Sequence, residues 1–329
     1  MKKNTKMKRV LAVISAILVL SMLCATFSGC TQKKKYTVGI CQLLPHAALD
    51  AATKGFMDAL IEEVGEENIT FINENAGNDV PTCTTIITNL VNKNVDLILA
   101  NATPALTAAV NGTDKIPILG TSITEYGTAL GLDDFDGLVG GNVSGTSDLA
   151  PLKEQAQMII DLFPEAERVA MLYASGEANS AYQVKEVRKY LEDKGITVID
   201  KAFADSNDVS AVAAAAAAEA DVIYIPTDNT AAGCAQTIDG VIGDTPVIAG
   251  EEGICTGCGV ATLTISYYDL GVTTGKMAAK ILKGEADISE MKIEYAENFT
   301  KKYNAAKCAE LGIDVEELEA KGYIAIEVE

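Results

Sequence analysis

Residues 95–119 read VDLILANATPALTAAVNGTDKIPIL and predict a strand, a helix and a second strand in close succession. The apolar runs at 95–99 and 116–119 are short enough for buried strands, and 103–110 has helical character. The same alternation begins at Tyr36 and continues along most of the chain. Strands that alternate with helices in this way predict a parallel sheet that is covered by helices on both faces.

The alternation restarts after about residue 146, which indicates two similar α/β halves with a cleft between them. We predict strands at residues 36–40, 69–72, 95–99, 116–119, 169–173, 196–199, 222–225, 246–249 and 260–265. We predict helices at residues 49–64, 81–92, 103–110, 149–163 (with Asp148 as its cap), 180–194, 209–220, 230–242, 268–282 and 301–311. The predicted fold class is therefore α/β, with two doubly wound parallel-sheet lobes joined by a hinge. In such sheets ligands bind beyond the carboxyl ends of the strands.

The first 30 residues have the order of a secretory signal peptide: a basic start, an apolar run at 10–24 and small residues before Cys30. The apolar run is shorter than the roughly 20 residues of a membrane-spanning helix, although an uncleaved anchoring helix is an alternative. The stretch Phe27-Ser28-Gly29-Cys30 resembles the bacterial lipobox, which implies that residues 1–29 are removed and Cys30 is lipidated. Residues 30–35 are then the lipidated cysteine and a polar tether.

Composition excludes some partners and cofactors. The chain has 46 acidic and 26 basic residues, for a net charge of −20, and an acidic chain is a poor partner for nucleic acid. Cys255-Thr256-Gly257-Cys258 is the one close cysteine pair, and His46 is the one histidine. A zinc site needs two more ligands, so we expect a local disulfide or free thiols, with no metal and no cofactor.

The loops that follow the predicted strands contain no Lys or Arg, which argues against phosphate or dicarboxylate ligands. A single carboxylate could be bound by hydroxyls at helix starts, and Asp228, Glu177 or Glu251 could bind an ammonium group. Tyrosines near the same loops could pack on an aromatic portion. These features together describe a site for an amino-acid zwitterion, although each Ser, Thr or Asp alone is also an ordinary helix cap.

An enzyme is disfavoured. A Ser-His-Asp or Cys-His set would have to use His46, and no G-x-S-x-G turn is present. We therefore predict no catalytic residue, and a role for His46 in a cleft loop or as a helix cap.

Several stretches resemble the ABC transporter substrate-binding proteins of the tryptophan/tyrosine-import type, which have the type I periplasmic-binding-protein fold. They are 46–50 with Gly55-Phe56, 102–105, 145–149, 173–180, 226–229 and 267–271. Together they span nearly the whole chain after the signal. The chain departs from the family at Ala47, where Pro is common, and at the CTGC stretch.

The resemblance implies a binding subunit that delivers a small solute to ABC permease subunits from the extracytoplasmic face of the membrane, anchored there by lipid. For some members the solute is an aromatic amino acid. The candidate ligand-binding residues are Thr103, Ser122, Ser147, Glu177, Asn179, Ser180, Asp228 and Asn229. In this prediction Thr103 and Ser122 bind the carboxylate and Asp228 pairs with the ammonium group. The alternatives are a nucleoside or sugar ligand, or a sensing subunit for a membrane receptor.

The predicted division of the chain assigns 36–145 and about 267–284 to lobe 1, and 146–266 and about 285–329 to lobe 2. Hinge strands are expected near residues 121, 145 and 266. Closure about these hinges would let the ligand contact both lobes at once.

Overall fold

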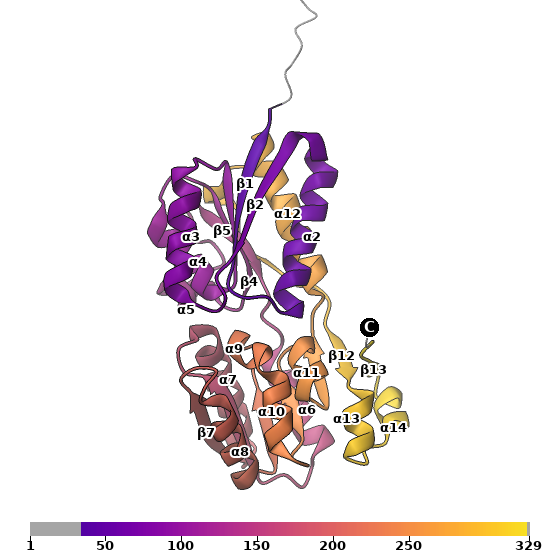
Figure 1. The fold of residues 1–329 in the computed structure, drawn as a ribbon. Coiled ribbons are helices and arrows are strands. Elements are labelled where there is room, and N and C mark those ends of the chain that lie inside the picture. The colour runs from indigo at the N-terminus through magenta and orange to yellow at the C-terminus, as the bar shows by residue number, and fades with distance from the viewer. Residues whose placement is uncertain (1–33, 328–329) are drawn as a thin grey trace, which may run out of the picture. The chain divides into compact units, whose positions relative to one another are not determined.

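The computed structural model describes residues 34–327, so the predicted signal peptide and the lipidation site at Cys30 lie outside the described residues. From Tyr36 onward the chain forms one compact unit. This unit contains two β-sheets, each flanked by helices (Figure 1).

The first sheet has six strands in the order β11-β5-β4-β3-β1-β2, and all neighbouring strands are parallel. The strands are β1 Tyr36–Gln42, β2 Ile69–Asn75, β3 Leu97–Asn101, β4 Ile118–Ile123, β5 Val143–Ser147 and β11 Glu294–Tyr295. The accompanying helices are α2 Ala47–Val64, α3 Val80–Asn92, α4 Thr103–Gly112, α5 Tyr126–Leu130 and α12 Tyr267–Lys283, with 3-10 turns η1 Glu66–Asn68 and η2 Ile288–Glu290.

The second sheet has seven strands in the order β13-β12-β10-β9-β8-β6-β7, and only the β10–β12 pair is antiparallel. The strands are β6 Arg168–Ala174, β7 Thr197–Phe203, β8 Val222–Ile225, β9 Val247–Ala249, β10 Ala261–Thr264, β12 Thr300–Tyr303 and β13 Ile324–Ala325. The helices are α6 Leu152–Leu162, α7 Ala178–Asp193, α8 Val209–Glu219, α9 Asn229–Gly233, α10 Ala235–Ile242, α11 Glu252–Cys258, α13 Ala305–Glu310 and α14 Val315–Ala320.

Successive residues of the central strands pack against helices on opposite faces. In β1, Val38 and Ile40 join the cluster formed with Phe56 of α2 and Met277 of α12, whereas Cys41 joins the cluster with Leu90 of α3. Strands buried on both faces are why the sequence shows unbroken apolar runs rather than alternation. The second sheet is covered in the same manner by two further clusters. The predicted fold class is confirmed.

The chain passes between the two sheets at 148–151, 265–266 and 296–299. The predicted hinges near 145 and 266 lie close to the first two passages, whereas residue 121 lies within β4. The division of the chain stays a prediction except near two of its boundaries. Residues 146–147 and 294–295 are assigned to lobe 2 by the prediction, but β5 pairs with β4 and β11 pairs with β5, so both belong to the first sheet. Ile288 likewise packs in the cluster of the first sheet.

Three predicted helices need correction. Residues 301–311 begin as β12 and only then form α13, because 300–303 pair with β10. The helix expected over 230–242 is two helices that break at Cys234. The helix expected from 149 begins at Leu152, and Pro151 rather than Asp148 occupies its cap position. Asp148 is therefore left available for another role.

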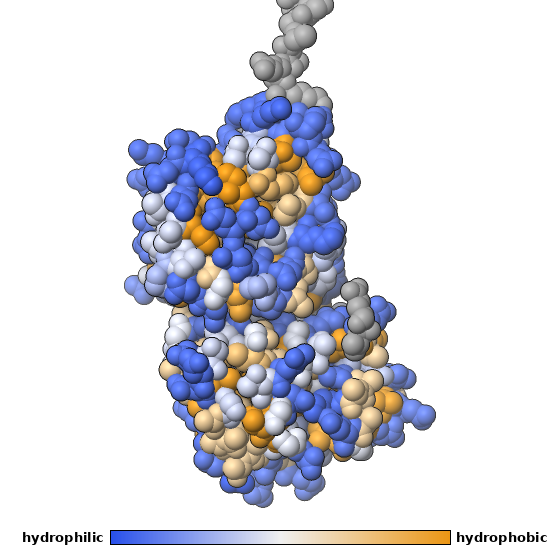
Figure 2. All heavy atoms as spheres, viewed as in Figure 1, coloured by the Kyte–Doolittle hydropathy of each residue, from blue (hydrophilic) through white to orange (hydrophobic). Residues whose placement is uncertain are grey.

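The surface in one view is largely hydrophilic (Figure 2). Figure 2 shows one face on which hydrophilic side chains cover much of the area and apolar ones gather in smaller patches.

Candidate functional site

A small cavity lies where the carboxyl ends of strands from both sheets meet. Its lining residues are His46, Leu49, Ser122, Thr124, Asp148, Asn179, Thr227, Asp228, Asn229, Ala232, Glu251 and Tyr267. His46 follows β1, Asp148 follows β5, and Asp228 and Glu251 follow β8 and β9. The position is the one expected for ligands in doubly wound sheets. The cavity measures about 10 Å³, which leaves room for about one water molecule.

Two side-chain contacts join the two halves of the chain near this cavity. Asn78 Nδ2 donates to Thr230 Oγ1 at 3.1 Å, and His46 Nε2 lies 3.5 Å from Asn229 Oδ1. Asn78 and His46 belong to the first half and Asn229 and Thr230 to the second. The halves therefore meet directly beside the lining residues.

Polar atoms without partners converge on this cavity. Among the described residues, six buried side-chain polar atoms have neither a hydrogen-bond partner nor an ion pair, and four of them line the cavity. They are His46 Nδ1, Ser122 Oγ, Asp148 Oδ1 and Asn179 Oδ1. Buried polar groups are normally paired, because an unpaired one costs about 1–3 kcal/mol. A concentration of them in one place indicates that a ligand completes their hydrogen bonds.

Asp148 is the charged member of this group. Its Oδ2 accepts from Tyr267 Oη at 3.0 Å, whereas Oδ1 has no partner, and the residue is only 4% exposed. Burial raises the pKa of the Asp148 carboxyl to about 6. At neutral pH the site thus contains a desolvated carboxylate that has the Tyr267 and Thr124 hydroxyls beside it and no well-formed hydrogen bond to Oδ1.

Asp228, by contrast, is saturated by the protein itself. Its Oδ2 accepts from Ser180 Oγ and from the Ala174 N–H, both at 2.7 Å, and its Oδ1 accepts from the Ala231 N–H at 2.7 Å. Burial, with the nearby Glu177 charge as a second cause, raises the pKa of Asp228 to about 7. Its contacts are those of a carboxylate that caps α9 and ties it to β6.

Glu177 and Glu251 are also used as caps. Glu177 accepts from the backbone N–H groups of Asn229 and Thr230 and from the side chains of both residues. Glu251 accepts from the N–H groups of Gly253 and Ile254 at the start of α11. Burial raises the pKa of Glu251 as well. Since none of the twelve lining residues is Lys or Arg, the cavity favours a cationic group.

Ser122 has an unusual backbone. Its φ of 55° lies in the left-handed region, next to an irregular register between β4 and β5. A non-glycine residue in this region costs of order 1–3 kcal/mol and is enriched at ligand sites. The conformation accompanies a hydroxyl that is buried without a partner in the cavity wall.

The structure brings together half of the predicted site. Ser122, Asn179, Asp228 and Asn229 line the cavity. The other four predicted residues, Thr103, Ser147, Glu177 and Ser180, are buried but are not among its lining residues.

Three of these four have internal partners that explain their positions, and those of Glu177 are the Asn229 and Thr230 contacts described above. Ser147 Oγ donates to Thr124 O and accepts from the Leu149 N–H, so it fixes the chain where β5 leaves the first sheet. Ser180 donates to Asp228.

Lining residues that the prediction did not select are Leu49, His46, Thr124, Asp148, Thr227, Ala232, Glu251 and Tyr267. Most of these residues lie in loops just after a strand, and this position is the feature of the sequence that could have identified them. Asp148 and Asp228 both follow a strand, so their positions in the sequence do not distinguish them. They differ in the number of hydrogen-bond partners, because the Asp228 oxygens accept three hydrogen bonds and Asp148 Oδ1 accepts none. Most of those donors come from segments far apart in the chain.

We expect Asp228→Ala to act mainly on stability. The substitution leaves the Ser180 hydroxyl and the Ala174 and Ala231 N–H groups without their acceptor, and losing such partners costs about 1–3 kcal/mol each. Thermal unfolding of the ligand-free protein checks this. An unchanged melting temperature together with lost ligand binding would instead give Asp228 a direct role in recognition.

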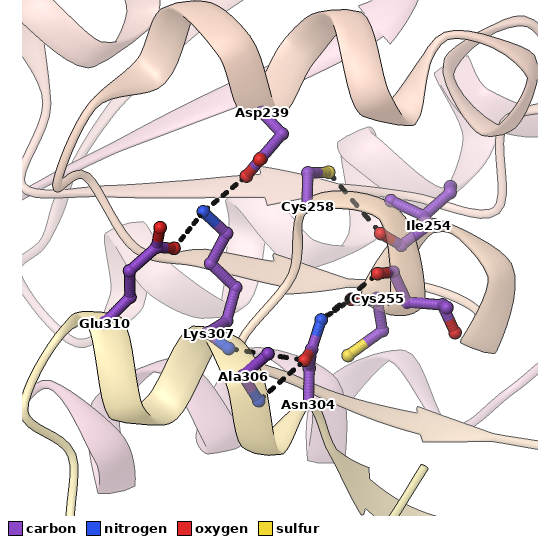
Figure 3. A network of polar contacts seen from close by, with 9 residues as sticks. Asp239, Ile254, Cys255, Cys258, Asn304, Ala306, Lys307 and Glu310 are labelled. Atoms are coloured by element: carbon purple, nitrogen blue, oxygen red, sulfur yellow. Dashed lines mark hydrogen bonds and ion pairs between the residues drawn. The ribbon is translucent and has the colours of Figure 1, made fainter. Parts of the chain in front are cut away.

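The CTGC cysteines lie away from the cavity. Cys255 and Cys258 are buried free thiols on α11, and burial raises the pKa of each. In Figure 3 they stand beside the contacts that attach α13, where Asn304 Nδ2 donates to Cys255 O at 3.0 Å. Lys307 of α13 pairs with Asp239 and Glu310 in the same network. These cysteines are therefore core residues of the second lobe, and of the two predicted states it is the free-thiol one that is found.

No cluster of three or more His, Cys, Asp or Glu side chains is placed to bind a metal ion within residues 34–327. In the same range, none of the helices combines the length and the apolar character that crossing a membrane requires.

A family model described as ABC transporter substrate binding protein matches residues 37–321. The chain belongs to this family. A curated relative, the "Tyrosine-binding protein" of Clostridioides difficile (strain R20291), is 34% identical over 302 residues, which cover 85% of this chain and 86% of that protein. The resemblance noted in the sequence is thus confirmed, and this substrate-binding protein is extracytoplasmic like its family.

Two solved structures are similar to this substrate-binding protein over most of its length. An ABC domain in complex with L-Trp from Streptococcus pneumonia is 30% identical, with a TM-score of 0.82 over 88% of this chain and 100% of that chain. The ligand-free, open structure of a substrate binding protein with adhesive properties from Clostridium difficile is 32% identical, with a TM-score of 0.68 over 89% of this chain and 100% of that chain.

Proposed function

We propose that this substrate-binding protein captures an aromatic amino acid between its lobes and presents it to ABC permease subunits. One observation carries the proposal: Asp148 Oδ1 is a buried acceptor on a carboxylate, has no partner, and lies in the wall of the cavity. The ammonium group of an amino acid supplies a charge-assisted donor for it. The relative that is named for tyrosine and the structure that contains L-Trp support the aromatic class.

Asp148 takes the place that the sequence analysis gave to Asp228. The Asp228 oxygens already accept three hydrogen bonds from the protein, so they are less available to the ammonium group than Asp148 Oδ1. Ser122 keeps its predicted role, since its unpartnered hydroxyl can donate to the ligand carboxylate. Thr103 lies outside the cavity wall and has no direct role in this account.

Capture requires that the lobes separate and close. A cavity of about 10 Å³ is far smaller than an amino acid, so the ligand enters an opened form and closure surrounds it. Asp148 is the first residue of the passage at 148–151, and Tyr267 directly follows the passage at 265–266, so the ligand would contact the hinge directly.

Anchoring through a lipid on Cys30 is part of the proposal. The lipobox-like sequence before Cys30 supports it, together with the polar tether that follows. Mass spectrometry of the protein from membranes tests this, since a diacylated Cys30 at the N-terminus is the expected result. A soluble, unmodified chain would contradict it.

The ligand assignment is tested by isothermal titration of the purified protein with the twenty amino acids, several nucleosides and several sugars. We expect saturable binding of tyrosine or tryptophan at one site. Binding only of a nucleoside or a sugar would keep the family and overturn the ligand class.

We also expect affinity to fall at acid pH. The ammonium group binds the charged form of Asp148, whose pKa in the empty site is about 6, so protonation competes with the ligand. The dissociation constant should rise about tenfold between pH 7 and pH 5. Titrations at both pH values check this. An Asp148→Asn variant should show a smaller rise, and Asp228, whose pKa is about 7 and which lines the same cavity, accounts for the remainder.

A further inference from the structure

Tyr267 lies at the hinge. It is the first residue of α12 and directly follows the passage at 265–266, and only 7% of it is exposed. Its ring belongs to an apolar cluster that also contains Ala52 of α2 and Leu270 of α12. The residue lines the cavity as well, and there its hydroxyl contacts Asp148. The ring is therefore part of the core, and the hydroxyl is the part that reaches the site.

The hydroxyl of Tyr267 meets residues from both halves of the chain. Tyr267 Oη donates to Asp148 Oδ2 at 3.0 Å, and Asp148 follows β5 of the first sheet. The Thr227 hydroxyl also lies beside it, and Thr227 follows β8 of the second sheet. A phenol has one proton to donate, and here Asp148 accepts it.

The bond between Tyr267 and Asp148 also connects two passages between the sheets. Asp148 begins the passage at 148–151, and Tyr267 directly follows the passage at 265–266. Ala296, in the third passage, packs against the cluster that contains Tyr267. Closure of two lobes changes the backbone angles of such connecting segments. A bond between two of these passages is thus in a position to act on closure.

The same bond acts on the charge of Asp148. Burial raises the pKa of this carboxyl to about 6, and the hydrogen bond from Tyr267 opposes that rise. Of the other titratable groups in the cavity wall, Glu251 raises this pKa further, Asp228 is a second acid, and His46 interacts with Glu251. The Tyr267 hydroxyl therefore favours the charged form of Asp148, which is the form that binds an ammonium group.

We propose that Tyr267 is a positioning residue of this site: its hydroxyl holds Asp148 with Oδ1 toward the ligand and couples the bound ammonium group to closure of the lobes. The inference rests on the proposed function and adds the residue through which Asp148 acts on the hinge. The ring of Tyr267 fills its cluster, and the hydroxyl alone positions the carboxylate. Removal of the hydroxyl alone therefore distinguishes positioning from packing.

The test is isothermal titration of Tyr267→Phe with L-tyrosine and L-tryptophan, from about pH 5 to pH 8. The substitution keeps the ring and removes the donor. We expect the dissociation constant at pH 7 to rise about 10-fold or more, because a hydrogen bond to a charged group is lost. The pH below which affinity falls should move upward by about one unit, because Asp148 protonates more readily without this donor. A loss of affinity that is the same at every pH shows a packing role and overturns the inference.

Two control variants assign the effect to the bond with Asp148. Tyr303→Phe removes another hydrogen bond from a tyrosine to a carboxylate, Tyr303 Oη to Glu319 Oε1 at 2.7 Å, and should bind normally because neither residue lines the cavity. In an Asp148→Asn background, Tyr267→Phe should change the affinity by less than about threefold, because the charge that the hydroxyl supports is absent. A full further loss in that background contradicts a role through Asp148.

Small-angle X-ray scattering measures closure in the same variants. The unchanged protein should become more compact with saturating ligand, and Tyr267→Phe should do so less completely at saturation. Equal compaction contradicts the coupling to the hinge. Binding by Tyr267→Phe within about twofold of the unchanged protein overturns the inference and leaves the proposed function intact. If the unchanged protein binds neither amino acid, the proposed function itself fails.

Discussion

Asp148→Asn will weaken binding of the amino-acid ligand by about 100-fold while the ligand-free protein remains folded. Asparagine has the same shape and can still accept from Tyr267, but it offers the ammonium group a neutral oxygen in place of a charged one. Losing one partner of a buried charged pair costs about 2–5 kcal/mol, which corresponds to between roughly 30-fold and several thousand-fold in affinity.

The same substitution should not lower stability at pH 7. Burial raises the pKa of Asp148 to about 6 in the folded protein, from 3.8 as the ordinary value. A raised carboxyl pKa favours folding below the ordinary value, and this contribution is lost as pH rises through about 6. At pH 7 the charged form is desolvated at a cost that asparagine does not have.

Titration calorimetry and thermal unfolding of Asp148→Asn together separate the two effects. Asp193→Asn, at an exposed acid near the end of α7, is the matched control and should bind normally. Binding of tyrosine by Asp148→Asn within about threefold of the unchanged protein would remove Asp148 from the ligand site.

Gly271→Ala is expected to produce a large loss of stability. Gly271 lies on α12 where this helix crosses α2, and an added Cβ would stand 2.0 Å from the backbone oxygen of Ala52. The neighbouring atom is backbone, so relief requires that one helix moves. Overpacking of this kind costs about 3 kcal/mol or somewhat more.

A matched control exists on another helix. Gly240 is exposed on α10 and an added Cβ there meets nothing within 4 Å. Gly240→Ala should therefore raise stability by about 0.5–1 kcal/mol, through helix propensity alone. Thermal unfolding of both variants checks the pair. Equal melting temperatures would show that α2 and α12 do not cross as closely as described.

The elements that could be predicted from the sequence are those with a strong local pattern. The apolar runs that became β1, β3, β6 and β8 are buried on both faces, so their pattern does not depend on partners. β5 escaped prediction because Val-Ser-Gly-Thr-Ser has almost no apolar run, although all five residues are buried. Polar strands near a hinge are recognised only when the strand beside them is known.

The C-terminal region shows a different limit. Residues 301–311 have helical composition, but Thr300–Tyr303 pair with β10 and so form a strand. Long-range pairing overrides local propensity here, as it commonly does for short strands. The same reason applies to Glu294–Tyr295, whose partner is β5 of the first sheet.

For the site, the sequence predicted which loops line the cavity. It did not predict which acidic side chains cap helices and which one is available to a ligand. Asp228 and Glu177 both follow strands and both looked available. Except for the Ala231 N–H, their donors come from residues about 50 positions away along the chain, so most of the saturation of these carboxylates is invisible in the sequence. Asp148 looked like a helix cap, and only the observed start of α6 at Leu152 releases it from that role.

A crystal structure of the protein with bound L-tyrosine tests the central claim most directly. The account predicts that the amino acid lies between the lobes, with its ammonium nitrogen within hydrogen-bonding distance of Asp148 Oδ1. An ammonium group on Asp228 instead, or a ligand outside the cavity formed by the two lobes, would contradict it.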